Sequence, residues 1–226
     1  FGVRIDRLSM SDALTLIYVW AADAHVVQII HLVNAFSLVE AQQNPGLMRA
    51  LRSWRPRLNL ADGWPIAKLA KTERIAGADL MLAAARHPEL GKMRHVLLGG
   101  FGVALKAAIR QWKEAGGDPT IREPWMPDVA DGELVRMANT TPCDILWVAL
   151  GCPRQELWMH ANRDRLKAQV VIGVGAAFDF LAGRIRRAPV WVQRAGLEWA
   201  WRIVQEPLRW RRQVGAAVGF VRLMLR

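Results

Sequence analysis

Short apolar runs alternate along this chain with longer segments whose apolar positions recur at helical spacing. The run HVVQIIHLV at 25–33 is nearly continuous and rich in β-branched residues, as strands buried on both faces of a parallel sheet are. Because strands and helices alternate throughout, the pattern predicts an α/β fold: a Rossmann-like parallel sheet with helices on both faces. Further strands are expected at 58–60, 95–98, 121–125, 145–150 and 170–174, and helices at 12–20, 35–41, 45–54, 65–71, 77–85, 103–115, 131–139 and 155–164.

The length of 226 residues suits one α/β domain with a small appendage. We expect an α/β catalytic domain at 1–183 and an Arg/Trp-rich, helical C-terminal appendage at 184–226. The two cysteines, Cys143 and Cys152, provide no disulfide framework and fit a reducing compartment. No apolar run reaches the roughly 20 uninterrupted residues that a membrane span needs.

The positive charge of the chain is concentrated near its C-terminus. The formal net charge is +11, and ten arginines but only two glutamates follow Gly183, so this last fifth carries eight of the eleven charges. Such asymmetry favours a polyanionic partner: nucleic acid, anionic lipid or a phosphorylated substrate. Tryptophans between the arginines suit a membrane interface or base stacking, and they equally suit helices packed on the domain with Trp inside and Arg solvated. These tryptophans are Trp191, Trp199, Trp201 and Trp210.

Polar or glycine residues follow most of the expected strands directly. In parallel sheets, the carboxyl ends of the strands meet at one edge, where ligands bind. These positions therefore define a candidate site before any other consideration. They are Asn34, Asp62, Gly99-Gly100, 151–155 and 175–179.

The candidates differ in how strongly they indicate chemistry. Gly99-Gly100-Phe101-Gly102 lies between a strand and a helix, where glycines and a helix N-terminus can hold phosphate, although an ordinary tight turn explains it equally well. Asp62 can serve as a general base, but spacing alone favours a turn or capping aspartate.

Three further polar residues are candidates, and two of them, Asn34 and Asp179, have two interpretations each. Asn34 is either a hydrogen-bonding group for substrate or a residue that simply ends a strand. Arg74, between two helices, by itself indicates a surface arginine. Asp179 either accepts hydrogen bonds from a sugar or base, or faces the dipole at a helix start.

The sequence lacks the motifs that indicate metal binding or a nucleophilic Ser or Cys. It has no D-x-D pair, no H-x-x-x-H and no Cys/His cluster, so we expect neither a metal site nor a cofactor. It also has no Ser or Cys in a nucleophile-elbow setting.

Read together, these motifs resemble the TagA–WecG–CpsF glycosyltransferase family over about 26–213. The C-terminal part of the pattern is long and specific. The matching segments are Asn34-Ala35, Ala61-Asp62-Gly63, Arg74 with 77–80, Leu98-Gly99-Gly100, 143–156 (CDILWVALGCPRQE), 171–183, Arg187-Ala188-Pro189, 196–199 (GLEW) and Gln205-Glu206-Pro207.

The resemblance implies an activity. Members move a sugar from a UDP-sugar donor to a polyprenyl-diphosphate-linked acceptor on the cytoplasmic membrane face, for cell-surface polymers such as exopolysaccharide. The implied reaction is inverting and metal-independent, and the implied location is peripheral on the inner face of the cell membrane. No nucleic acid is expected as a partner.

The resemblance also implies residue roles. Asp62 would be the general base that takes the acceptor's hydroxyl proton. The other positions would bind substrate: Asn34, Arg74, Gln155, Gly99 and Gly100 in the pocket, Asp179 at the nucleotide-sugar, and Arg202, Arg209 and Arg212 at the diphosphates and the membrane.

The chain departs from the family pattern near the substrate pocket. Leu32 stands where many members have Thr, and the segment between Asp62 and Arg74 is shorter than usual. Both UDP-N-acetylmannosamine and UDP-glucose are therefore candidate donors. Two alternatives remain: a non-catalytic domain that binds nucleic acid through the basic tail, and a scaffold protein that has kept the fold without the chemistry.

Overall fold

The fold is built around one parallel β-sheet. The computed structural model describes residues 1–53, 57–100, 102–117, 120–121, 129–195, 197–205 and 210–225, with the side chains of 120, 121, 199 and 210–213 left out of the description. Within the described residues, six strands lie in the order β2-β1-β6-β5-β3-β4, and every described pairing is parallel, which confirms the predicted α/β class. They are β1 (Gln28–Val33), β2 (Arg57–Ala61), β3 (His95–Gly99), β4 (Thr120–Ile121), β5 (Ile145–Ala149) and β6 (Val170–Gly173).

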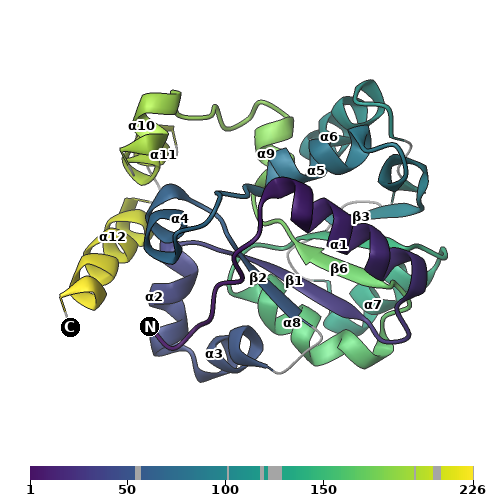
Figure 1. Ribbon diagram of the computed structural model, residues 1–226, viewed down its shortest axis with the longest axis horizontal. Helices are drawn as coiled ribbons and strands as arrows, with labels where there is room; N and C mark the ends of the chain where they lie inside the picture. The colour runs from purple at the N-terminus through teal and green to yellow at the C-terminus, as the bar shows by residue number, and fades with distance from the viewer. Residues whose placement is uncertain are drawn as a thin grey trace.

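Helices cover both faces of the sheet (Figure 1). Helices α1 (Met10–Asp23), α5 (Gly77–Arg86), α6 (Gly102–Glu114) and α9 (Ala177–Leu181) pack on one face, where the largest hydrophobic cluster lies. Helices α7 (Asp131–Asn139) and α8 (Arg154–Asn162) cover the other face. Since both faces are buried, β1, β3, β5 and β6 are buried along their whole length, as their continuous apolar runs indicate.

A third hydrophobic cluster lies at the β2 edge of the sheet. It joins the ends of β1 and β2 to α2 (Ala35–Gln43), α3 (Pro45–Arg52) and α4 (Trp64–Ala70), and Phe220 from the C-terminal segment packs against it. The register pairs Val33 with Ala61, so the residues that follow them, Asn34 and Asp62, emerge side by side.

Some predicted boundaries were wrong. The first helix is capped by Ser9, whose hydroxyl oxygen accepts from the Asp12 amide, and not by Ser11 and Asp12. The first strand begins at Gln28 rather than at residue 25. Helix α3 ends at Arg52, and β4 is described only at Thr120–Ile121; the rest of the predicted 121–125 strand lies outside the described residues, as does residue 54.

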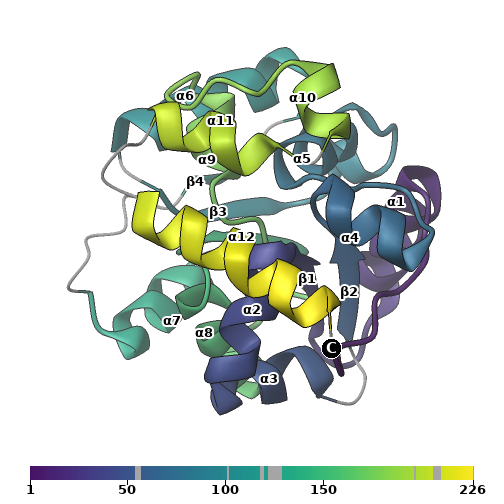
Figure 2. The same cartoon turned by 90° about the vertical axis from the view of Figure 1, so that its left-hand side faces the viewer.

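The C-terminal segment forms helices on the side of the sheet where the strands end. It contains α10 (Val190–Arg194), α11 (Glu198–Gln205) and α12 (Trp210–Met224). Figure 2 shows α12 lying across α2, with α10 and α11 above it. Among the described residues, no helix combines the length and apolar character that crossing a bilayer requires. The division of the chain at residue 183 stays a prediction.

Remaining turns complete the element order. Short 3-10 turns occur at Leu90–Lys92 and Arg163–Arg165.

Of the tail tryptophans with described side chains, Trp191 is 71% exposed, while Trp201 is half-buried and its indole N–H donates to the Arg186 carbonyl at 3.1 Å. The alternative in which the tail tryptophans pack inside therefore does not describe Trp191.

Candidate active site

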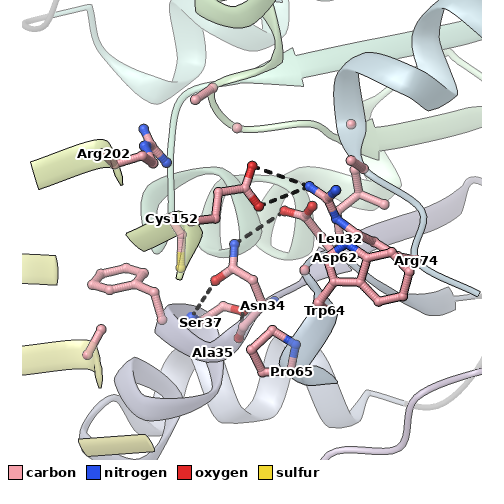
Figure 3. A pocket seen from close by; sticks show the side chains of 18 of the residues that line it. Leu32, Asn34, Ala35, Ser37, Asp62, Trp64, Pro65, Arg74, Cys152 and Arg202 are labelled. Atoms are coloured by element: carbon pink, nitrogen blue, oxygen red, sulfur yellow. Dashed lines mark hydrogen bonds and ion pairs between the residues drawn. The ribbon is translucent and has the colours of Figure 1, made fainter. Parts of the chain in front are cut away.

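A cavity of about 490 Å³ lies where the carboxyl ends of the strands face the C-terminal helices. Its floor comes from the ends of β1, β2 and β6, and its far wall comes from α10, α11 and α12 (Figure 3). This is the sheet edge that the sequence pattern indicated. Of the predicted site residues, Asn34, Asp62, Arg74, Gln155 and Arg202 line the cavity.

Asn34 and Asp62 form a hydrogen-bonded pair on the cavity floor. The Asn34 side-chain oxygen accepts from the Ser37 amide at 3.1 Å and so caps α2, while its nitrogen donates to Asp62 Oδ2 at 3.3 Å. The backbone adds a tie, because the Asp62 amide donates to the Val33 carbonyl at 2.8 Å. Asn34 therefore both starts a helix and orients a carboxylate, so neither interpretation of it excludes the other.

The environment of Asp62 raises the pKa of its carboxyl group. Burial is the largest cause; the nearby charge of Glu198 raises the pKa further, whereas Arg74, the Asn34 hydrogen bond and Arg187 lower it. A raised pKa means that the ionised carboxylate accepts a proton more readily, which suits a general base. Asp62 thus lies buried in the cavity lining, and its role as a general base stays a prediction.

Arg74 is not the surface arginine that its position between helices suggests. Its side chain is only 10% exposed, and Nη2 donates to Glu198 Oε2 at 3.0 Å. Its Nη1 donates to the side-chain oxygen of Gln193. Both partners come from more than a hundred residues further along the chain, and both line the cavity.

Gln155 fixes the glycine turn that follows β6. Its side-chain oxygen accepts from the Gly175 amide at 3.0 Å, and its nitrogen donates to Glu156 Oε1 at 2.8 Å. A Cβ at Gly173 would lie 3.0 Å from the Gln155 nitrogen, so glycine there allows the close approach. Gln155 thus shapes the cavity wall, and direct contact with substrate stays a prediction.

Two guanidinium groups and an aromatic ring form another part of the wall. The guanidinium carbons of Arg187 and Arg202 lie 5.6 and 5.5 Å from the centre of the Phe180 ring, and all three residues line the cavity. Arg187 also pairs with Asp79 at 2.7 Å. These cations are placed where they can contact an anionic group in the cavity.

Part of the cavity lining is apolar. Phe36 from α2 and Ala216, Ala217, Phe220 and Val221 from α12 line it. The cavity thus presents charged groups at its floor and hydrocarbon near α12, which suits an amphipathic ligand.

Two predicted site glycines are not placed in the cavity. Gly99 and Gly100 are absent from its described lining; a Cβ at Gly99 would lie 2.6 Å from the Ala149 carbonyl oxygen, and one at Gly100 would lie 2.8 Å from the Phe178 ring. Close packing therefore explains both glycines without a phosphate, and their ligand role stays a prediction.

The three remaining predicted site residues are Asp179, Arg209 and Arg212. Asp179 lies in the first turn of α9 with Arg184 at 3.4 Å, outside the cavity's described lining, which favours the helix-start interpretation. Arg209 lies outside the described residues, as does the side chain of Arg212.

Sequence reasoning missed several cavity residues. Glu198, Gln193 and Arg187 received no role, although Arg187 and Glu198 stand within the segments that carried the family resemblance. Periodicity gives no signal for them, because their relation to Asp62 depends on how the tail folds back. Among the described residues, no group of three or more His, Cys, Asp or Glu side chains is arranged to hold a metal ion.

Comparison with known proteins identifies relatives of this chain by sequence. The sequence model described as "Glycosyl transferase WecG/TagA/CpsF family" matches residues 1–226. A protein of Bacillus spizizenii named N-acetylglucosaminyldiphosphoundecaprenol N-acetyl-beta-D-mannosaminyltransferase is 32% identical over 189 residues, covering 77% of this chain and 70% of that protein. A Bacillus subtilis protein of the same name is 34% identical over 145 residues, 62% of this chain, and the match spans just over half, 56%, of that relative's length.

The family match covers the whole chain, including the segments that form the cavity floor and the tail helices. The protein therefore belongs to the WecG/TagA/CpsF family of glycosyl transferases.

Proposed function

We propose that this protein transfers a hexosyl or N-acetylhexosaminyl group from a UDP-sugar to a polyprenyl-diphosphate-linked saccharide. The observation that carries the proposal is Asp62, a carboxylate with a raised pKa on the floor of a cavity that also contains three arginines. The named relatives act on an undecaprenyl-diphosphate-linked N-acetylglucosamine, which supports a lipid-linked acceptor.

The proposed step is a direct displacement that inverts the anomeric centre. Asp62 takes the proton of the acceptor hydroxyl as its oxygen forms a bond to the anomeric carbon of the donor sugar. The bond from that carbon to the diphosphate oxygen breaks, and its electron pair leaves with UDP. A base of this kind contributes about 10²–10⁴-fold to the rate.

Negative charge grows on the diphosphate as it leaves. Arginine side chains can stabilise it without a metal ion, and Arg187 and Arg202 stand together beside Phe180 for this purpose. Arg74 contributes a third positive charge close to Asp62. We propose that Arg209 and Arg212 extend this set.

The apolar part of the cavity lining suits the acceptor's lipid chain, and the tail suits the membrane surface. The apolar residues of α12 and Phe36 can lie against isoprene units next to the diphosphate. Arginines and tryptophans of the tail suit an anionic bilayer surface, so we propose peripheral association with the inner face of the cell membrane. The product would enter a cell-envelope polysaccharide such as an exopolysaccharide.

UDP-N-acetylmannosamine and UDP-glucose are the two candidate donors. The names of the relatives favour N-acetylmannosamine. Leu32, which lines the cavity, offers no hydroxyl to the donor and keeps UDP-glucose as the second candidate.

The test is a donor screen with purified protein and a short-chain polyprenyl-diphosphate-linked N-acetylglucosamine. Release of UDP is followed for each donor, with and without acceptor and in the presence of a chelator. Acceptor-dependent release from one donor is the expected result, and Asp62→Asn should slow it by about 10²–10⁴-fold while UDP still binds. Asp23→Asn, an exposed aspartate at the end of α1, is the matched control.

Silence with every donor on lipid vesicles as well as in solution would contradict the proposal. Tight, strongly salt-dependent binding of oligonucleotides that is indifferent to Asp62→Asn would instead favour a nucleic-acid-binding domain.

A further inference from the structure

Arg74 is held from one side by two residues of the C-terminal helices. Its Nη2 donates to both carboxylate oxygens of Glu198, at 3.0 and 3.4 Å, and its Nη1 donates to the Gln193 side-chain oxygen. Figure 3 shows this guanidinium and the Asp62 carboxyl facing the same cavity. The two nitrogens at the tip of Arg74 are thus directed at the tail and not at open solvent.

The two partners of Arg74, Gln193 and Glu198, are held in place by the surrounding structure. Gln193 is 8% exposed, and its side-chain nitrogen donates to the Ala188 carbonyl at 2.6 Å, which leaves its oxygen directed at Arg74. Lys68 of α4 donates to the Arg194 carbonyl at 2.9 Å and ties the same turn to the domain. Glu198 begins α11 and is 23% exposed, so it is accessible from the cavity.

Charges of both signs surround Asp62. Arg74 and Arg187 favour its ionised form, and Glu198 disfavours it. Arg187 is paired with Asp79, and Arg74 is paired with Glu198, so each cation near Asp62 has a carboxylate partner. Among the described residues, the charged ones that line the cavity are Asp62, Arg74, Glu156, Arg187, Glu198 and Arg202.

Glu198 therefore has two effects on Asp62. Its own negative charge disfavours a second negative charge nearby, and its ion pair reduces the positive field of Arg74. Both effects make the ionised Asp62 carboxylate a stronger proton acceptor. Removing the charge of Glu198 reverses both together.

We propose that Glu198, supported by Gln193, is a positioning residue for the transfer reaction, which holds Arg74 against the cavity wall and offsets its charge beside the Asp62 base. The inference rests on the proposed function, because that function makes Asp62 the base. It adds a role for a residue of α11 that does not itself touch the reacting atoms.

The test removes the charge of Glu198 and keeps the shape of its side chain. Glu198→Gln retains an oxygen for Arg74 but is neutral. We expect the acidic limb of the kcat/KM profile to move to lower pH by about one unit, with a lower plateau, because Asp62 becomes a weaker base. Glu198→Asp restores the charge and should return the limb towards its original pH, and Glu114→Gln, an exposed glutamate of α6, is the matched control.

A second measurement does not need turnover. The Asp62 carboxyl carbon is followed by ¹³C NMR as pH is varied, and its signal is assigned by its loss in Asp62→Asn. Glu198→Gln should lower the titration midpoint, and Gln193→Glu, which adds a negative charge on the other side of Arg74, should raise it.

The outcomes separate the two proposals. Equal midpoints in the unmodified protein, Glu198→Gln and Gln193→Glu would overturn the positioning role, whatever the turnover. Full turnover in Asp62→Asn would overturn the proposed base, and the midpoints would still report whether Glu198 tunes that carboxyl.

Discussion

The side-chain nitrogen of Asn34 lies 3.3 Å from Asp62 Oδ2, and the same side chain caps α2 through its oxygen. One amide therefore connects the start of a helix to the candidate base. The register of β1 with β2 makes this possible, because Val33 and Ala61 are paired and the two polar residues follow them. Capping and orientation can be separated by substitution, since they use different atoms of Asn34.

Asn34→Ser keeps a capping oxygen and removes the donor to Asp62, whereas Asn34→Ala removes both. We expect Asn34→Ala to lower the free energy of unfolding by about 0.5–2 kcal/mol and Asn34→Ser to change it little. Since the hydrogen bond lowers the pKa of Asp62, the acidic limb of the rate profile should move to higher pH in both variants. Urea unfolding and kcat/KM profiles measure the two effects; a limb that moves only in Asn34→Ala would contradict this division.

Asp62→Asn should stabilise the protein at neutral pH. The pKa of Asp62 is raised by folding, so the folded state binds its proton more tightly and loses stability as pH rises through that pKa. Asparagine removes this cost, and each 1 kcal/mol gained raises Tm by about 2–4 °C in a chain of this size. Thermal unfolding at pH 7.5 and at pH 4 tests the sign: the advantage of the variant should shrink at the lower pH. An advantage that is equal at both values would show that the charge is not its cause.

Two buried histidines should make the protein acid-sensitive. Burial lowers the pKa of His31 to about 3, and burial also lowers the pKa of His95. Trp147 donates to His95 Nδ1 at 3.1 Å, so His95 Nε2 must carry the proton that is donated to the Leu90 carbonyl at 2.7 Å. We therefore expect both rings to be neutral in the folded protein near pH 7.

The unfolded chain binds a proton at each of these histidines near pH 6.5, the ordinary value, while the folded chain does not. Stability should therefore fall below that pH, by up to about 1.4 kcal/mol per pH unit for each histidine. Denaturant unfolding between pH 7.5 and 5 measures the slope. His31→Gln should reduce it, and His25→Gln, at an exposed position before β1, should leave it unchanged.

Gly219 and Gly215 offer a matched test of how α12 packs. A Cβ at Gly219 would lie 2.6 Å from a methyl carbon of Val39 in α2, whereas one at Gly215 meets nothing within 4 Å. Alanine favours a helix over glycine by about 1 kcal/mol, so Gly215→Ala should strengthen α12. Gly219→Ala should instead loosen it, because overpacking costs about 1–3 kcal/mol.

Hydrogen exchange of the α12 amides distinguishes these two variants. Faster exchange in Gly219→Ala and slower exchange in Gly215→Ala are expected, with a lower transfer rate only in the former, because Ala216 and Phe220 of α12 line the cavity. Equal protection in both variants would contradict the close contact with Val39.

The sequence by itself determined the layered α/β architecture. Continuous apolar runs fix buried parallel strands, and the polar residues that end them must gather at one edge. Asn34, Asp62 and Gln155 were predicted on that basis and on family resemblance, and the structure places all three at the cavity. Their catalytic or binding roles stay predictions.

Only the tertiary structure decided what surrounds Asp62. The contact of Arg74 with Glu198 joins residues 124 positions apart in the chain, and no local period or spacing encodes such a pair. The same holds for Gly99 and Gly100, where an added Cβ would meet Ala149 and Phe178. Strand and helix formation depends on local patterns, but burial and the balance of charges at a site depend on which distant segments fold back over it.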